Sequence, residues 1–229
     1  MTRPARAGHA VLVLVAVVLS SHTLAQSQAI PAPTEGCRVV VDYRDATVGE
    51  FPKGWEARDD AARATYRVVR EGDLLFVRGT AEGTGSQIGR EFPWDATKEP
   101  ILSWRWRPRV FPTGADERDS KRYDSPLAVY AVFGTSPMTR AVKYIWSRVV
   151  PVGTALSTSR ALAIVLRVGP PPDEDWVTES VNVRQDYEHL YKEAPGRARG
   201  VAVLTDADQT RSRAVGDYGE FRVCPDRPK

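Results

Sequence analysis

The sequence predicts an all-β protein, mainly an antiparallel β-sandwich of jelly-roll type, with one short helix near residues 183–194. Short apolar segments rich in β-branched and aromatic residues recur between turn signals along most of the chain. Only one segment follows helical spacing, and strands do not alternate with helices as they do in βαβ units. Such strands are expected to form antiparallel sheets that pack face to face around one core.

Residues 1–25 are expected to be a cleaved signal peptide. Arg3 and Arg6 give a basic start, residues 10–19 form an unbroken apolar run, and small residues precede a cleavage site after Ala25. The run is short for the roughly 20 residues that span a bilayer, so a retained membrane anchor is the less favoured alternative. The sequence therefore predicts a periplasmic or secreted protein with no membrane span after cleavage.

The rest of the chain is expected to form a flexible lead at 26–36 and a single domain at 37–226. About 200 residues suit one domain with a sizeable core. The 32 basic and 29 acidic residues nearly balance, and no polybasic segment calls for nucleic acid or an anionic membrane as a partner.

The two cysteines, Cys37 and Cys224, lie near the two ends of this domain. In an oxidising compartment such a pair predicts a disulfide, with two buried free thiols as the alternative. The chain-entropy model assigns roughly 5 kcal/mol to a bridge that closes so long a loop. Cys37 lies too far from the apolar run to be a lipid-attachment site.

The domain begins with a strand at 39–41, followed by two strands at 66–69 and 74–77 that a tight turn at 71–73 joins. The next segment, 101–107, alternates with period two. Its Leu102, Trp104 and Trp106 are expected to face the core, with Ser103, Arg105 and Arg107 on the other face. Further strands are expected at 128–133, 144–147, 161–168, 201–205 and 220–223.

The single helix is predicted from apolar residues at helical spacing, and Pro195 with Gly196 ends it. The residues that carry this spacing are Val183, Tyr187, Leu190, Tyr191 and Ala194. His189 falls on the polar side of this helix and is expected to be exposed to solvent.

Several catalytic classes lose support because His189 is the only histidine beyond the leader. One histidine and two distant cysteines do not make a zinc site. The chain lacks the H-E-x-x-H, G-x-S-x-G, S-x-x-K and P-loop patterns. Glycines 79, 83, 85 and 89 do not match the dinucleotide fingerprint, and they are expected in turns that flank a strand.

Carboxylates are the remaining candidates for chemistry. Asp116, Glu117, Asp119 and Asp124 lie between two predicted strands, and Asp206 and Asp208 follow another. Two such acids could act as a glycosidase pair if they faced one cleft about 5 to 10 Å apart.

The segment from Asp206 to Thr210 also offers oxygen ligands at alternating positions, as hard cations such as calcium prefer. It is no EF-hand, because Arg211 stands where that loop needs glycine. A structural calcium at Asp206 and Asp208 is one expectation. The other is a polar loop whose aspartates cap turns and pair with Arg211 or Arg213.

Six tryptophans are many for this length. Exposed indoles would stack on sugar rings, whereas buried ones would fill the core. Trp104 and Trp106 share a predicted face with Leu102 and are expected in the core. Trp94 and Trp176 stand beside aspartates and turn residues, which favours exposure.

The chain resembles the bacterial domain of unknown function 3047 family (DUF3047) from about Phe51 to Val223. The order and spacing of seven stretches carry this resemblance. They are FPKGW (51–55), ATY (64–66), PILSWRW (100–106), YIWS (144–147), VRQDY (183–187), LTDADQT (204–210) and DYGEF (217–221).

The resemblance implies an exported β-sandwich similar to carbohydrate-binding jelly rolls, of galactose-binding-like architecture, and it supplies no catalytic residue. It also marks two departures. An acidic pair is usual where this chain has Tyr123 and Asp124, and an asparagine where it has Lys143. A polar site at these positions would be altered in this member.

The leading hypothesis is a non-catalytic β-sandwich that binds a saccharide or similar polar ligand. The predicted ligand-binding residues are Tyr123, Asp124, Trp146, Asp206 and Asp208. No cofactor is expected beyond the structural calcium. One alternative is an envelope structural or assembly protein without a small ligand, and another is a glycoside hydrolase or lyase that uses Asp124 with Asp206 or Asp208.

Overall fold

The computed structural model describes residues 36–134, 138–157, 161–171 and 175–226. The predicted signal peptide and nearly all of the predicted lead lie outside these residues. Within the described part, no helix has the length and apolar character that a membrane crossing would need.

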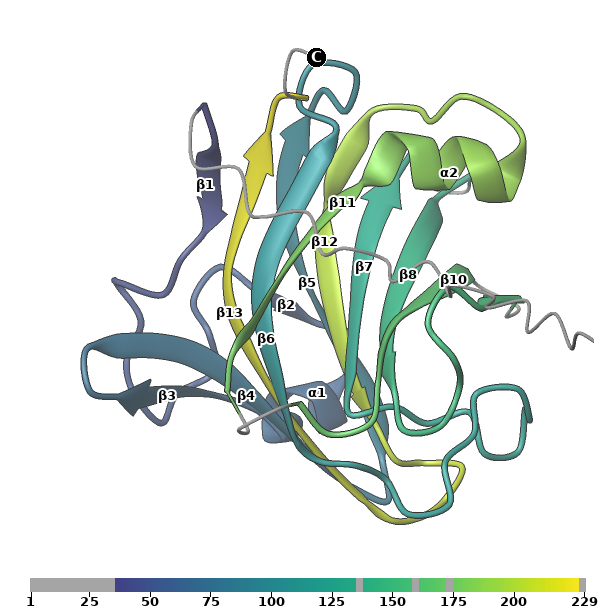
Figure 1. The fold of residues 1–229 in the computed structure, drawn as a ribbon. Helices are drawn as coiled ribbons and strands as arrows, with labels where there is room; N and C mark the ends of the chain where they lie inside the picture. The colour runs from purple at the N-terminus through teal and green to yellow at the C-terminus, as the bar shows by residue number, and fades with distance from the viewer. Residues whose placement is uncertain (1–35, 135–137, 158–160, 172–174, 227–229) are drawn as a thin grey trace, which may run out of the picture.

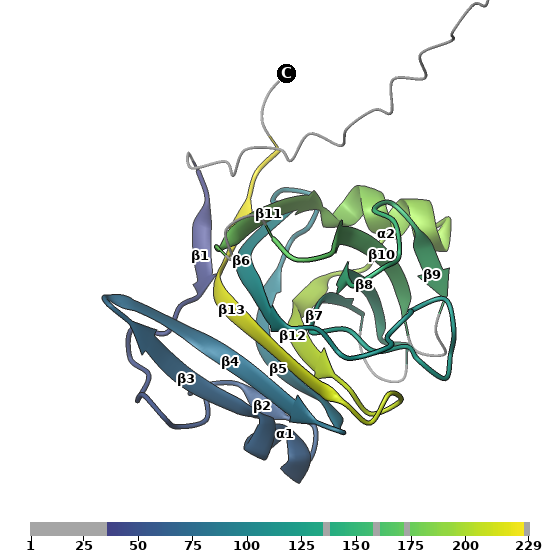
Figure 2. The ribbon, with the colours of Figure 1, turned by 60° about the horizontal axis from the view of Figure 1, so that its bottom comes forward.

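Two β-sheets pack face to face (Figures 1 and 2). Sheet A has the order β11-β6-β13-β4-β3, with β1 also paired to β13. Its strands are β1 (Arg38–Val41), β3 (Tyr66–Glu71), β4 (Leu74–Glu82), β6 (Ile101–Val110), β11 (Val177–Asn182) and β13 (Arg213–Cys224).

Sheet B has the order β2-β5-β12-β7-β8-β10-β9. Its strands are β2 (Glu56–Ala57), β5 (Gly85–Trp94), β7 (Leu127–Phe133), β8 (Arg140–Ser147), β9 (Ala155–Ser157), β10 (Leu162–Val168) and β12 (Ala198–Asp206). The predicted β-sandwich is confirmed. Its pairs are antiparallel except that β10 runs parallel to β8.

Two helices lie at opposite ends of the sandwich in Figure 1. The predicted helix is α2 (Val183–Tyr191), which begins after the cap Asn182 and ends where Lys192 takes a φ of 59°. The helix therefore stops before Pro195, and His189 is exposed as expected. The sequence does not predict α1 (Asp60–Thr65), because six residues are too few to show a helical period.

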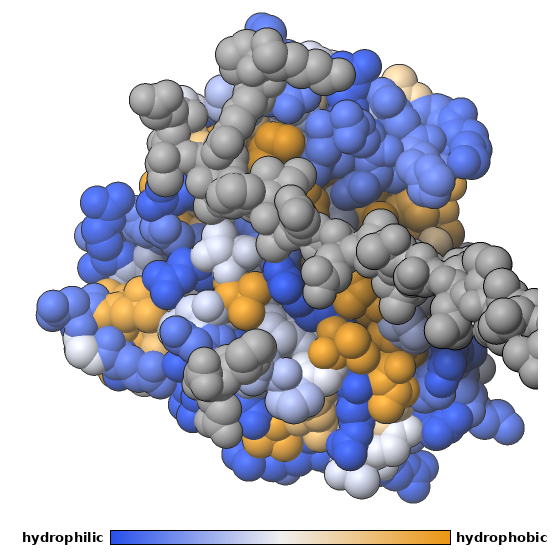
Figure 3. Space-filling model, viewed as in Figure 1, coloured by the Kyte–Doolittle hydropathy of each residue, from blue (hydrophilic) through white to orange (hydrophobic). Residues whose placement is uncertain are grey.

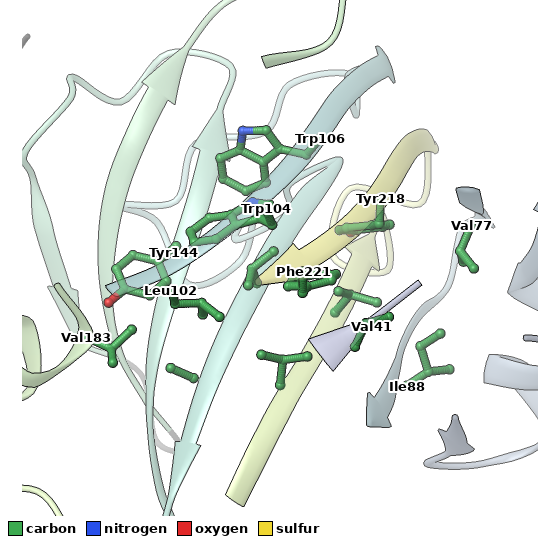
Figure 4. Close-up of a cluster of buried hydrophobic side chains, with 14 of the residues drawn as sticks. Val41, Val77, Ile88, Leu102, Trp104, Trp106, Tyr144, Val183, Tyr218 and Phe221 are labelled. Atoms are coloured by element: carbon green, nitrogen blue, oxygen red, sulfur yellow. The ribbon is translucent and has the colours of Figure 1, made fainter. Parts of the chain in front are cut away.

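Aromatic side chains from both sheets fill the space between them (Figure 4). Leu102, Trp104 and Trp106 face this core, as the alternation along β6 predicts. The rings of Trp104 and Trp106 lie 5.3 Å apart, and Trp104 lies 5.5 Å from Tyr144 of sheet B. This contact joins the two sheets.

The expected exposure of Trp94 is wrong. Trp94 is 2% exposed, its ring stacks on Phe92 at 5.1 Å, and its indole N–H donates to the carbonyl of Glu99 at 3.1 Å. The polar neighbours that favoured exposure belong to the following turn, whereas Trp94 itself ends a strand that points into the core. Trp176 is half-buried on the outer face of sheet A.

The expectation that glycines 79, 83, 85 and 89 lie in turns is also largely wrong. Gly79 lies within β4, Gly85 and Gly89 lie within β5, and only Gly83 is in the turn between the two strands. The short strand predicted at 220–223 is the end of β13, which is much longer. The predicted disulfide is confirmed, with Cys37 bonded to Cys224.

Two buried tyrosine hydroxyls of sheet A hold the end of β12 in sheet B. The Tyr66 hydroxyl donates to the carbonyl of Ser86 at 2.9 Å and accepts the backbone N–H of Thr205 at 2.8 Å. The Tyr218 hydroxyl donates to the carbonyl of Leu204 at 2.7 Å and lies 3.0 Å from the Thr205 hydroxyl. These bonds fix where β12 ends.

Replacing Tyr66 with phenylalanine should destabilise the protein by about 1–3 kcal/mol, because a buried N–H and a buried carbonyl lose their partner. Urea unfolding monitored by circular dichroism measures this loss. Tyr123→Phe is the matched control, since the Tyr123 hydroxyl is buried without a hydrogen-bond partner among the described residues. Equal losses in the two variants would show that the Tyr66 hydroxyl does not hold β12.

Candidate functional site

The outer face of sheet B carries polar residues at the end of β12 and across its neighbours. Because side chains alternate along a strand, Thr205 faces the core and Asp206 faces outward. One cross-strand row on this outer face runs from β5 to β8, since each residue is paired with the next. The row consists of Gly89, Ala202, Tyr130 and Lys143.

Three aspartates meet at one end of this face. Asp124, Asp206 and Asp208 each place one carboxylate oxygen so that all three oxygens lie within 4.8 Å of one another. Asp124 is fully buried and Asp206 is 8% exposed, while Asp208 is exposed. We call these three residues the acidic cluster.

Backbone contacts hold the acidic cluster together. The Asp124 carboxylate accepts the backbone N–H groups of Gln209 at 3.2 Å and Thr210 at 2.7 Å. The backbone N–H of Asp206 donates to the carbonyl of Ser125 at 3.0 Å. The connection between β6 and β7 is thereby tied to the loop that follows β12, which brings together aspartates that are far apart in sequence.

Gly85 makes room for Asp206. The two residues are cross-strand partners at the edge of the β5–β12 pair. A Cβ atom at Gly85 would lie 1.9 Å from Oδ1 of Asp206, which no side chain tolerates without displacing the carboxylate. The glycine that the sequence analysis assigned to a turn therefore serves a close approach within the sheet.

Two carboxyls of the acidic cluster, those of Asp206 and Asp208, hold their protons more tightly than ordinary carboxyls do. Burial, and then the charges of Asp208 and Asp124, raise the pKa of Asp206 to about 7, while Lys143 opposes the rise. The pKa of Asp208 is raised by burial first and by Asp124 next. Like charges in a poorly hydrated place disfavour full ionisation, so the cluster retains a proton near neutral pH.

A buried lysine lies beside the acidic cluster. The ammonium of Lys143, a residue only 3% exposed, lies 4.6 Å from the ring centre of Tyr123 and 5.6 Å from that of Tyr130. Buried Glu117 accepts the Ser147 hydroxyl, and its pKa is raised by burial, which the charge of Lys143 opposes. We call Glu117, Tyr123, Tyr130 and Lys143 the lysine group.

The sequence did not single out Tyr130, it marked Lys143 only as a departure from the pattern of the family that the chain resembles, and it offered Glu117 only as one of several carboxylates. A single polar or amphipathic residue in an otherwise apolar strand, such as Tyr130 in LAVYAVF, is the sequence signal that could have predicted these site residues. Lys143 lay one residue outside the predicted strand 144–147, so its outward phase was not seen.

The site contains polar atoms with unused hydrogen-bonding capacity. Among the described residues, five buried side-chain polar atoms have no hydrogen-bond partner. Three of them, Oε1 of Glu117, the Tyr123 hydroxyl and Oγ of Ser125, belong to the connection between β6 and β7 that forms the site. Because buried polar groups are nearly always paired, these three atoms are free to bond water or the polar atoms of a ligand.

A hollow of about 280 Å³ lies on the same face, over β5, β12 and β7. Its lining includes Gln87, Gly89, Glu91, Val132, Arg199 and Ala202. Gly89 and Ala202 are small, and Ala202 is the cross-strand neighbour of Tyr130. The hollow therefore adjoins the lysine group, so polar groups and a concavity share one face.

Four of the five predicted ligand-binding residues meet at this site, and Trp146 does not. Trp146 faces the core on the side of β8 opposite Lys143, with its ring 5.5 Å from that of Trp106. Its indole N–H donates to the carbonyl of Gly169 at 2.7 Å. The prediction of Trp146 as a ligand-binding residue assigned it no strand face, and its position in the core separates it from the other four residues.

The polar-loop alternative also fails in one respect. Among the described residues, neither Arg211 nor Arg213 forms a salt bridge with these aspartates, and Arg213 bonds Glu82 at 2.6 Å instead. Asp124, and not Asp206, supplies the main cap of the loop. The carboxylates of Asp206 and Asp208 thus remain directed at each other and at Asp124.

Comparison with known proteins gives a family. A family profile described as "Protein of unknown function (DUF3047)" matches residues 53–222. No curated protein matches the chain.

The solved structures to which this chain is similar include two carbohydrate-binding proteins and one enzyme domain. TmCBM61 in complex with β-1,4-galactotriose is 11% identical at a TM-score of 0.40, covering 81% of this chain and 99% of that one. A family 30 carbohydrate-binding module of a Clostridium thermocellum cellulosomal cellulase is 8% identical at 0.43, covering 84% and 99%. The xyloglucanase domain of NopAA, a type three effector from Sinorhizobium fredii, in complex with cellobiose, is 10% identical at 0.40, covering 79% and 99%. No activity or residue role carries over at such similarity.

The raised pKa of Asp206 predicts how stability depends on pH. A carboxyl whose pKa is higher in the folded chain than in the unfolded chain favours folding while it is protonated. Stability from this group is therefore complete below about pH 4 and falls as the pH rises to about 7. Asp206→Asn, which cannot ionise, should gain stability relative to the unmutated protein between these pH values.

Urea midpoints at pH 4, 6 and 8 measure this difference. Asp45→Asn is the control, because Asp45 is exposed and away from the cluster. If Asp206→Asn loses stability with rising pH as steeply as the unmutated protein does, then Asp206 does not carry the shift.

Proposed function

Because this chain belongs to the DUF3047 family of proteins of unknown function, we propose its function from the site alone: the outer face of sheet B binds a saccharide without cleaving it. The observation that carries the proposal is the concentration of buried, incompletely paired polar groups beside a hollow on one outer sheet face. The Cys37–Cys224 disulfide fits a protein that acts in the periplasm or outside the cell.

A saccharide matches the mixed chemistry of this face. A sugar hydroxyl donates one hydrogen bond and accepts others, so neighbouring hydroxyls can serve the acidic cluster and the Lys143 ammonium together. Hydrogen bonds to charged groups are the stronger ones, about 1.5–3 kcal/mol each. The half-buried ring of Tyr130 adds a partly apolar surface between the lysine and the hollow.

The spacing of the strands suits a short oligosaccharide. Neighbouring strands lie roughly 4.8 Å apart, so the three steps from β5 to β8 span roughly 14 Å. The floor of the β5–β12–β7 hollow is made of small residues, which lets a ring approach the sheet closely. A ligand that lies across the strands would reach from Gln87 in the hollow to Lys143.

A glycan panel tests the proposal. We expect binding of one glycan class by the mature domain, with affinity lowered at least tenfold in Asp206→Asn and in Lys143→Met, because each loses a charged hydrogen-bonding group. Asp45→Asn is the control and should bind as the unmutated protein does. Isothermal titration calorimetry measures the affinities. Binding that both site variants leave unchanged, or no binding to any glycan, would refute the assignment.

The same panel decides between binding and hydrolysis. The pKa of about 7 at Asp206 is the property of a general acid, whereas the carboxylate oxygens of the acidic cluster, all within 4.8 Å of one another, lie closer together than the roughly 5 to 10 Å of a glycosidase pair. Shorter products released by the unmutated protein and absent with Asp206→Asn would identify an enzyme that uses Asp206 with Asp124 or Asp208. Intact glycans after incubation support the non-catalytic proposal.

Calcium binding at the acidic cluster is a second candidate function. Three carboxylate oxygens within 4.8 Å of one another form a hard-cation ligand set, and a cation would relieve the repulsion that raises the pKa of Asp206. The charge of Lys143 acts against a cation, and for this reason we place calcium second.

If calcium binds, it should raise the thermal midpoint more at pH 8 than at pH 5, because Asp206 must release its proton first. At a hundred times its dissociation constant, calcium would add about 2.7 kcal/mol. Magnesium is the matched probe, and Asp206→Asn should abolish the calcium shift. A midpoint that calcium leaves unchanged at pH 8 would exclude this function.

A further inference from the structure

We propose that a second hollow, on the outer face of sheet A, binds an organic monocarboxylate with an apolar body. This site does not depend on the function proposed for sheet B. The hollow has a volume of about 470 Å³ and is lined by residues of β1, β4, β6 and β13 together with Trp176. That volume is within the range of roughly 300–1,000 Å³ that is usual for small-molecule sites.

Arg105 is the cation of this hollow that has no carboxylate partner. Its guanidinium lies over the ring of Trp176, 5.3 Å from the ring centre. Among the residues that the structure describes, no carboxylate lies within salt-bridge distance of Arg105. By contrast, Arg44 bonds Asp42 at 2.6 Å and Arg222 bonds Glu220 at 2.7 Å.

The neighbouring arginine on the same face of β6, Arg107, already has carboxylate partners. Arg107 also stacks on Trp176, at 4.7 Å, but its guanidinium bonds both Asp217 and Glu71. Arg105 therefore presents the one guanidinium fork of the hollow that can pair with an incoming carboxylate. Such pairs are bidentate and charge-assisted.

A glycine brings these groups together. The ring of Trp176 and the side chain of Arg105 lie directly over Gly219 of β13. A Cβ atom there would come within 3.0 Å of Cβ of Arg105 and 3.5 Å of the Trp176 ring. The absence of a side chain at this position lets both groups form the wall of the hollow.

The far wall of the hollow is apolar. Leu74 and Leu75 are half-buried, and Val39 is 38% exposed. Figure 3 shows an orange patch at the left, where the β3–β4 hairpin of Figure 1 lies, with blue residues around it. A ligand that fills this space gains free energy by burying an apolar body against the leucines.

The charges select a monoanion. With Asp42 and Glu220 paired to arginines, Arg105 is the remaining cation and exposed Asp73 the remaining anion among the lining residues that the structure describes. A ligand with two or more negative charges would place at least one of them without a partner and near Asp73. One carboxylate on an apolar body satisfies Arg105 and the leucines together.

Octanoate tests the proposal. Octanamide is the control that keeps the apolar chain without the negative charge, and acetate is the control that keeps the carboxylate without the apolar chain. Trp176 reports the binding, since the other five tryptophans are buried and Trp176 is half-buried. We expect a saturable change in tryptophan fluorescence with octanoate, and at least tenfold weaker binding of octanamide and acetate. Arg105→Gln should weaken octanoate at least tenfold and leave octanamide unchanged.

Arg109→Gln is the control, because Arg109 is exposed on the same strand and does not line the hollow. Arg105→Lys keeps the positive charge but cannot form a bidentate pair with a carboxylate. It replaces Arg105→Gln in the experiment if that variant does not fold. Asp206→Asn should bind octanoate normally, which separates this site from the one on sheet B. The proposal is wrong if octanoate does not saturate, if octanamide binds equally well, or if both Arg105 variants bind octanoate as tightly as the unmutated protein.

Discussion

The hydrogen bonds of two tyrosines from sheet A to the end of β12 fix the geometry on which the site depends. Tyr66 and Tyr218 hold the backbone and side chain of Thr205 between the sheets. With Thr205 turned inward, the two-residue period of a strand leaves Asp206 no other direction than outward. The next residues then turn toward Asp124, whose carboxylate accepts their N–H groups. A buried contact of the core thus determines the position of an acidic cluster on the surface.

The two outer faces treat buried charge in different ways. On sheet A the fully buried Asp217 is matched by Arg78 at 2.6 Å and by Arg107 at 2.8 Å, so the charge is neutralised within the chain. On sheet B the buried carboxylates lie beside one another, and the result is a raised pKa at Asp206. The paired charges on sheet A are neutralised within the chain, so their presence needs no explanation beyond the stability of the fold. The unmatched charges on sheet B destabilise it, which is the usual sign of a functional site.

How far the sequence predicts this structure depends on how local each signal is. The alternation along 101–107, the hairpin turn at 71–73 and the cysteine pair are local or unambiguous, and each is confirmed. Trp146 shows the limit, because the strand was recognised without its phase, and an error of one residue exchanges the two faces. The outward direction of Lys143 was not predicted, because Lys143 precedes the predicted strand 144–147 by one residue. The meeting of Asp124 with Asp206 was only a hypothesis, because it rests on backbone bonds between distant loops that no local pattern encodes.

Glycine is the residue that makes room for a side chain on each outer face. Gly85 allows the Asp206 carboxylate to lie against β5, and Gly219 allows Arg105 and Trp176 to close over β13. In both cases the backbone φ is not positive, so conformational freedom does not explain the residue. The reason is space, because a Cβ atom would overlap the Asp206 carboxylate at Gly85 and would lie only 3.0 Å from Cβ of Arg105 at Gly219. A glycine within a strand weakens the sheet, and its presence beneath a charged side chain therefore marks a place where close approach outweighs strand stability.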